Sequence, residues 1–149
     1  MVRPLGISLL VVFAFGCSKA EVSYVGKWRI TPPQLSDSAT DLAKKGISAL
    51  GGSTLELTAD HKMVWNVVSG GLPVAFTGTW EKKDGKTLGT ITDIQGRPIA
   101  DVLGFIADPV QKSAIQDLAK PFEFTSAPDG KAQMQSSKPG SPILKLEKA

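Results

Sequence analysis

The feature that most constrains the fold of this chain is a period-two alternation of apolar and polar residues, which recurs from Tyr24 to Leu146. Such alternation is typical of half-buried β-strands, in which successive side chains point to opposite faces of a sheet. In the first example, Trp28 and Ile30 share a face with Tyr24 and Gly26, while the polar side chains from residue 27 onward point the other way. The pattern predicts a mainly β protein.

The later strands and their turns follow the same pattern. Asp84-Gly85 and Asp129-Gly130 each separate two alternating runs, and Asp-Gly is a strong signal for a type I′ hairpin turn, whose two central residues need a positive φ. At Asp60-His61 the second position is His, which tolerates that region better than most residues, so His61 is interpreted as a turn residue rather than a ligand. The predicted inward positions are Leu55, Leu57, Met63, Trp65, Val67, Val74, Phe76, Gly78, Trp80, Leu88, Thr90, Thr92, Ile94, Phe122, Phe124, Met134, Leu144 and Leu146.

Two stretches break the β pattern and predict two or three inserted helices. The first runs from Ser38 to Leu50 with apolar residues at helical spacing, and two glycines end it. The second runs from Pro98 to Lys120, where Asp108-Pro109 supplies an N-cap and a first helical residue for a second helix. The fold class expected is therefore a small antiparallel barrel or sandwich of about seven to eight strands with two or three inserted helices.

The N-terminal segment predicts export. Arg3 precedes an apolar stretch from Leu5 to Phe15, eleven positions long, which is shorter than the ~20 residues that a membrane-spanning helix needs. This is the pattern of a secretory signal peptide. The stretch ends in Ala14-Phe15-Gly16-Cys17, which resembles the lipobox of bacterial lipoproteins. The resemblance implies cleavage before Cys17 and attachment of a diacylglyceryl group to its thiol.

These signals divide the chain into a signal peptide (1–16), a lipid-anchored tether (17–21) and a single β domain (22–149). The expected location is the cell envelope, with the domain held at a membrane through Cys17 and facing the periplasm or the exterior. In a cell with two membranes, the resemblance to lipoproteins implies the outer one, because the residue after the cysteine is Ser18 rather than Asp. One alternative is ordinary signal peptidase cleavage after Gly16 or Ala20, which releases a soluble secreted protein, and another is an anchor that stays uncleaved.

A further resemblance concerns the β domain. Gly26-Lys27-Trp28 looks like the G-x-W signature that opens lipocalins, and "LELTADHKMVW" followed by "FTGTWEKKDGKTL" is similar to the strand-and-turn rhythm of small lipocalin-like bacterial lipoproteins. The similarity covers residues 22–94 and, loosely, the C-terminal strands. It implies an eight-stranded up-and-down barrel around an apolar ligand. The chain departs from the family in lacking a later T-D-Y-type motif and a clear counterpart of the C-terminal Arg.

Composition excludes several function classes. The formal charge of +3 falls to +2 without Arg3, which is too small a surplus to indicate nucleic acid as a partner. The chain has one Cys and one His, so neither a disulfide framework nor most zinc and copper sites are available. No metal site and no cofactor are expected.

The candidate ligand-lining residues are the aromatic side chains on the predicted inward faces. They could line an interior that holds a hydrophobic small molecule, since barrels of this size can hold one small ligand. The alternative, which we favour, is that they fill a small core. These residues are Trp28, Trp65, Phe76, Trp80 and Phe122.

No enzyme site is predicted from the sequence. Asp93, Asp101, Asp108 and Asp117 could in principle supply a pair of catalytic carboxylates, but a solvated helix surface accounts for them better. The leading hypothesis is a non-enzymatic, lipid-anchored envelope protein with a binding or structural role. The alternative is a lipocalin-like carrier or sensor of a hydrophobic small molecule.

Overall fold

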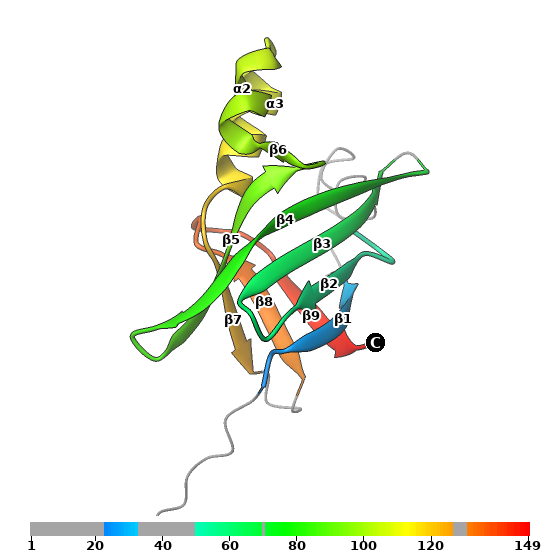
Figure 1. Cartoon of the computed structure of the whole chain (residues 1–149), viewed down its shortest axis with the longest axis vertical. Helices are drawn as coiled ribbons and strands as arrows, with labels where there is room; N and C mark the ends of the chain where they lie inside the picture. Colours follow the sequence, from blue (N-terminus) through cyan, green and yellow to red (C-terminus); the bar gives the residue numbers. More distant parts are fainter. Residues whose placement is uncertain (1–22, 33–49, 70, 127–130) are drawn as a thin grey trace, which may run out of the picture.

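The computed structural model describes residues 23–32, 50–69, 71–126 and 131–149 (Figure 1). Cys17 and the predicted helix at 38–50, except its last residue, lie outside these ranges, as does the Asp129-Gly130 turn. The elements in chain order are β1 (Gly26–Thr31), β2 (Thr54–Leu57), β3 (Lys62–Ser69), β4 (Leu72–Lys83), β5 (Lys86–Ile94), β6 (Arg97–Pro98), α2 (Ile99–Phe105), α3 (Pro109–Leu118), β7 (Phe122–Ser126), β8 (Ala132–Ser136) and β9 (Ile143–Lys148).

The strands form a closed antiparallel barrel, which confirms the predicted fold class and decides for a barrel over a sandwich. Eight strands make up the wall in the order β1-β2-β3-β4-β5-β7-β8-β9, so that each pairs with the next along the chain. Pairing of β9 with β1 closes the circle. The short β6 pairs with the last residues of β5 and forms no part of this circle.

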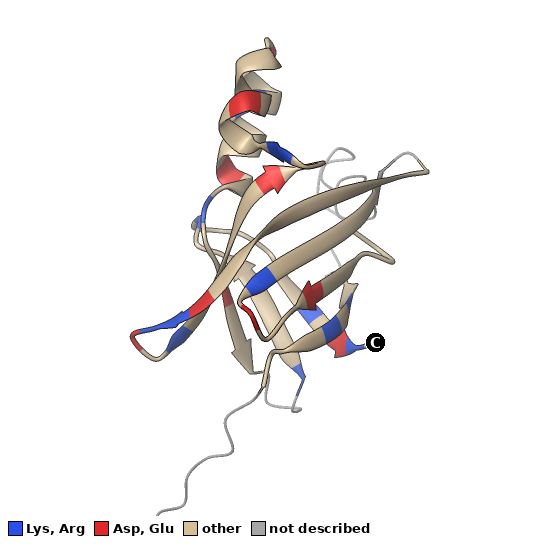
Figure 2. Cartoon of the chain, viewed as in Figure 1, with Lys and Arg blue, Asp and Glu red and all other residues tan. Residues whose placement is uncertain are grey.

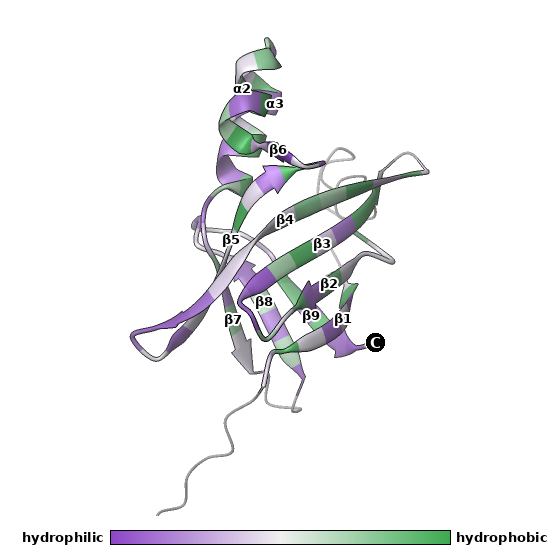
Figure 3. Ribbon diagram, in the orientation of Figure 1, coloured by the Kyte–Doolittle hydropathy of each residue, from purple (hydrophilic) through white to green (hydrophobic). Residues whose placement is uncertain are grey.

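The two ends of the barrel differ. At one end, which we call the helix end, α2 and α3 extend beyond the strands (Figure 1). The opposite end carries the start of β1 and the turn between β4 and β5 (Figure 1). Figure 3 shows the alternation of hydrophilic and hydrophobic residues along β3, and a hydrophilic tip on the β4–β5 hairpin.

The core lies inside the barrel and confirms most of the predicted strand faces. Buried side chains alternate with more exposed ones in seven of the strands that line it. The buried apolar residues at predicted inward positions are Tyr24, Trp28, Ile30, Leu55, Leu57, Met63, Trp65, Val67, Trp80, Phe122, Phe124, Met134, Leu144 and Leu146.

The predicted faces of β5 are wrong. Thr87, Gly89 and Ile91 are buried, whereas Leu88 and Thr90 are only half-buried and Thr92 is exposed. The strand places a threonine and a glycine inward because other strands already fill the space. A Cβ at Gly89 would lie 2.8 Å from the Phe124 ring and 2.9 Å from the Met63 sulfur.

A register shift restores the apolar pattern at the end of β5. The pairing of β4 with β5 shifts between Thr77 and Gly78, so that Ile94 lies opposite Phe76 and packs against the core. Such a bulge inserts one extra residue and turns the side chains beyond it to the other face. Simple alternation therefore cannot be extended across this point.

The turns behave as the sequence predicts. Asp84 and Gly85 both have positive φ angles, of 52° and 74°, and join β4 to β5 as the predicted hairpin requires. His61 has a φ of 64° in the turn between β2 and β3, which confirms it as a left-handed turn residue.

The two described helices confirm the prediction for residues 98–120. Asp108 caps α3 by accepting a hydrogen bond of 2.8 Å from the backbone N–H of Val110, with Pro109 at the first helical position. Ile99 of α2 is buried, and Leu103, Ile115 and Leu118 pack against the core, but α3 has no fully buried residue. The helix pair therefore contacts the barrel core through these four apolar residues, while the rest of it is largely exposed.

Gly78 should be essential for the β4–β5 pairing, because a Cβ there would lie 1.9 Å from the carbonyl oxygen of Thr90. We expect Gly78→Ala to lower the free energy of unfolding by about 3 kcal/mol, at the upper end of typical overpacking costs. Gly104→Ala is the matched control, since a Cβ at Gly104 has no atom within 4 Å and the residue is helical. It should be neutral or raise stability by up to ~1 kcal/mol. Chemical denaturation followed by tryptophan fluorescence measures both, and equal effects would contradict the geometry.

Candidate functional site

The predicted aromatic residues all face the interior but form two separate groups. Trp28, Trp65, Trp80 and Phe122 are buried, which confirms the expected burial of the three tryptophans, and Phe76 is half-buried. Three of these side chains meet toward the helix end of the barrel. Trp28 lies beside Tyr24, just before the start of β1, and Trp80 lies beside Thr58 in the turn between β2 and β3.

The group toward the helix end forms a contact across the barrel. The Trp65 ring lies 5.7 Å from that of Phe76 and 5.8 Å from that of Phe122, edge to face in the second case. Phe76 is on the neighbouring strand, but Phe122 belongs to β7, which is separated from β3 by β4 and β5. The interior is therefore occupied by side chains at this level.

Two buried polar atoms near this contact have no hydrogen-bond partner among the residues that the structure describes. They are the indole Nε1 of Trp65 and the hydroxyl Oγ of Ser53. Ser53 is fully buried, precedes β2 and alternates with the inward-facing Leu55, which pairs directly with Trp65. Leaving a buried donor without an acceptor costs about 1–3 kcal/mol, so these atoms mark a place where a polar group could bind.

Trp28 has a structural role beside the start of β1. Its indole N–H donates a hydrogen bond of 2.8 Å to the Tyr24 carbonyl, and the Lys148 ammonium lies 4.2 Å from the ring centroid. Lys148 also donates to the carbonyl of Val25 over 3.0 Å. Gly26 has a φ of 134° and leaves room for this ammonium, because a Cβ there would lie 2.9 Å from the Lys148 nitrogen. Trp28 therefore helps to join β1 to β9.

Trp80 likewise holds a turn in place. Its indole N–H donates to the carbonyl of Thr58 over 2.9 Å, and its ring lies 4.7 Å from the ring of His61. His61 Nδ1 lies 3.1 Å from the Trp80 carbonyl oxygen. These contacts join the β2–β3 turn to β4. Neither Trp28 nor Trp80 has a free N–H to offer a ligand.

The four aspartates considered in the sequence do not converge on one cleft. Asp93 is the penultimate residue of β5, Asp101 lies on α2 and Asp108 caps α3. Asp117 of α3 forms ion pairs with Lys138 and Lys120, and their hydrogen bonds lower the pKa of its carboxyl below the ordinary 3.8. A lowered pKa means that this pairing favours the folded state above about pH 3.8 and is lost as the pH falls below it.

Thr58 and Lys62 have a similar effect on the carboxyl of Asp60, whose pKa their hydrogen bonds also lower. Asp60 lies in the β2–β3 turn, and its carboxylate is 3.3 Å from the Lys62 ammonium. In the part of the chain that the structure describes, no group of three or more His, Cys, Asp or Glu side chains is placed to hold a metal ion.

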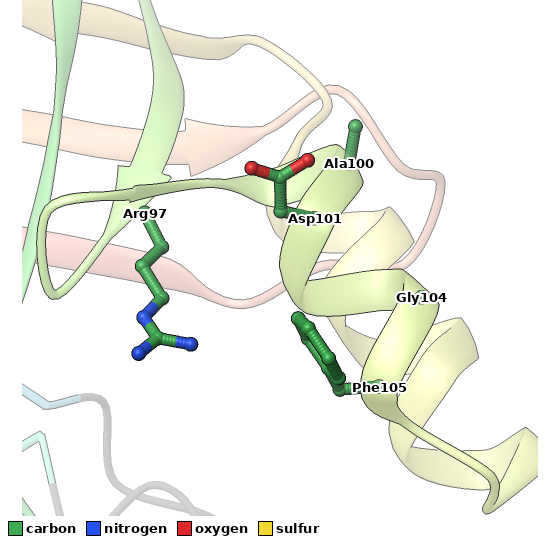
Figure 4. A pocket seen from close by; sticks show the side chains of 5 residues that line it. All are labelled: Arg97, Ala100, Asp101, Gly104 and Phe105. Carbon is green, nitrogen blue, oxygen red and sulfur yellow. The ribbon is translucent and has the colours of Figure 1, made fainter.

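A hollow that sequence reasoning missed lies outside the barrel, between β6 and α2 (Figure 4). Its volume is about 550 Å³, within the range of small-molecule sites. The lining residues are Arg97, Ala100, Asp101, Gly104 and Phe105. The sequence did hold one signal, because Phe105 falls outside the apolar stripe of Ile99, Val102, Leu103 and Ile106 that attaches the helix.

Neither family models nor curated proteins nor solved structures give a match to this chain. Within the described ranges, no helix has the length and apolarity needed to cross a membrane.

The contrast between two tryptophans gives a direct test of the interior. Trp28→Phe removes a hydrogen-bonded N–H, whereas Trp65→Phe removes one that has no partner within the described ranges. Both substitutions lose the same ring volume, so we expect Trp28→Phe to cost about 1–3 kcal/mol more in unfolding free energy than Trp65→Phe. Thermal or urea denaturation of the two variants measures this difference. Equal costs would mean that the Trp65 N–H has a partner in the purified protein.

Proposed function

We propose that the protein is a non-enzymatic, lipid-anchored protein of the cell envelope that acts through the surface of a filled barrel. The observation that carries this proposal is the contact of Trp65 with Phe122 across the interior. A large ligand would have to separate these rings. The close approach of Met63 and Phe124 to Gly89 supports the same interpretation deeper in the barrel.

The position of β1 supports an anchor at Cys17. Ser23, the first described residue, leads into β1 at the end of the barrel opposite the helices (Figure 1). The chain from Cys17 to Ser23 can span at most about 21 Å when fully extended. A lipid on Cys17 would therefore hold this end of the barrel close to the bilayer and point α2 and α3 away from it.

The charges at the same end of the barrel are compatible with a position near a membrane, but they would attract anionic lipids only weakly. Basic and acidic residues are interspersed there (Figure 2), and several form ion pairs. Lys27 lies 3.9 Å from Glu56 and Lys86 lies 3.3 Å from Glu123. Lys27 could add about 1 kcal/mol of attraction to anionic headgroups at most. The anchor itself would supply the main attachment.

Kinship with lipocalins is part of the proposal. It is supported by the up-and-down order of the eight strands and by Gly26 and Trp28, the residues of the G-x-W signature, in β1. The C-terminal Arg of that family has no clear counterpart in the sequence. Lys148 of β9 nevertheless supplies a cation over the Trp28 ring.

A second candidate function is favoured by the unpartnered Trp65 Nε1 and Ser53 Oγ. It is the carriage or sensing of a small, largely apolar molecule with one polar group, bound among Trp65, Phe76 and Phe122. Trp28 and Trp80 would take no direct part, because their N–H groups already donate within the protein. The comparison of Trp28→Phe with Trp65→Phe separates this candidate from an interior without a ligand.

The lipid anchor has a decisive test. Cells that express the chain are labelled with a radioactive fatty acid, and we expect label on the wild-type protein but none on Cys17→Ser, which lacks the thiol. Ser18→Ala is the matched control and should keep the label. An unlabelled wild-type protein that is released in soluble form would overturn the anchor in favour of ordinary secretion.

A further inference from the structure

The hollow between β6 and α2 presents an unused guanidinium. Arg97 is exposed, and its side chain has neither an ion pair nor a hydrogen bond within the part of the chain that the structure describes. A guanidinium offers a planar set of donors that fits carboxylate and phosphate oxygens in pairs. Figure 4 shows it extending from β6 toward the open side of the hollow.

The backbone that carries Arg97 is fixed on the barrel. Gln95 and Gly96 form the turn before it, both with positive φ angles, and Arg97 pairs with Ile94 of β5. Gln95 holds this turn against β4, since its backbone N–H donates to the carbonyl of Ala75 over 2.8 Å. Its side-chain amide donates to the carbonyl of Pro73 over 3.0 Å. These hydrogen bonds hold the backbone from which the Arg97 side chain extends.

The other wall of the hollow is apolar and open. Phe105 exposes 80% of its surface, which is unusual for a large aromatic side chain, and its ring lies on the same side of α2 as the Arg97 guanidinium (Figure 4). Ala100 and Gly104 are about one helical turn apart on α2, and their small side chains leave the helix surface in the hollow low. A Cβ at Gly104 would have no atom within 4 Å, so a flat group could lie against the helix there.

We propose that this hollow binds an amphipathic monoanion, with its carboxylate or phosphate group on Arg97 and its flat apolar body on Phe105 and Gly104. Asp101 also lines the hollow, with its carboxylate directed away from the guanidinium (Figure 4), and it disfavours a second negative charge on the ligand. The inference goes beyond the proposed function, because it requires neither the lipid anchor nor an empty barrel interior.

The experiment titrates the full chain with naphthoate and, separately, with the neutral naphthylmethanol, following the NMR shifts of the Gly104 amide and the Arg97 side chain. We expect naphthoate to shift both signals and to bind at least about tenfold more tightly than naphthylmethanol, the difference that a charge-assisted pair supplies. Equal binding of the two probes, or no shift with either, would overturn the proposal.

Three variants locate the binding. Arg97→Gln should weaken naphthoate at least about tenfold, and Gly104→Leu should place a side chain where the naphthyl group would lie against the helix and weaken binding without loss of fold. Lys112→Gln, which removes a cation from α3 outside the hollow, is the matched control and should bind as the wild type does. Retained affinity in Arg97→Gln would contradict the site even if Gly104→Leu failed to fold.

A second experiment, with lipid vesicles, distinguishes a free small anion from a lipid headgroup as the ligand. The chain is mixed with phosphatidylcholine vesicles that contain or lack phosphatidylglycerol, with Arg97→Gln in parallel. Naphthoate binding with no Arg97-dependent shift from vesicles supports a free small molecule, and both responses together support the same chemistry on a lipid headgroup. A response to vesicles alone would mean that the helix end contacts membranes, and it would overturn the small-ligand site.

Discussion

Pairing of β1 with β9 is the contact on which the rest of the structure depends. Every other pair in the barrel wall joins one wall strand to the next wall strand along the chain. The β1–β9 pair instead joins Trp28–Thr31 to Lys145–Lys148, near the two ends of the described chain. Loop closure over such a distance is costly in entropy and must be repaid by contacts. Ile30 and Leu146 supply buried apolar surface, and Lys148 adds its contacts with Trp28 and Val25. Closure also leaves few unpaired strand edges in the wall, such as the one at Leu72–Ala75 of β4, whose residues pair only with β3.

The closed wall decides where binding chemistry can lie. Once eight strands close, the inward side chains of opposite strands meet, as Trp65 and Phe122 do, and little polar chemistry enters the interior beyond Ser53, Thr87 and the Trp65 N–H in the described residues. The ligand-binding features that we propose on the outside lie where the chain leaves the wall. The connection from β5 to β7 is such a place, and it carries both the rigid turn at Arg97 and the exposed Phe105.

Much of the barrel was predictable because each strand face is a local property of the sequence. Alternation predicted the inward residues of six strands, β1 to β3 and β7 to β9, and Asp84-Gly85 and Asp108-Pro109 predicted a hairpin and a helix start. The faces of β5 were not predictable from its own residues. Gly89 faces inward because the side chains of Phe124 and Met63, from other strands, leave no room there for a larger residue. The choice between barrel and sandwich depends on long-range pairing, which a local pattern does not record. The hollow was missed because Arg97 and Phe105 come together only through the β6 turn.

The most direct test of this account is a nuclear Overhauser spectrum of the protein that records proton contacts between β1 and β9. The account predicts cross-strand contacts between the backbone protons of Ile30 and Leu146, and between those of Arg29 and Glu147, as strong as the contacts between Leu55 and Trp65 in β2 and β3. A spectrum that holds the β2–β3 contacts and lacks those between β1 and β9 would show an open sheet. The closed barrel, and the arguments built on its filled interior, would then be wrong.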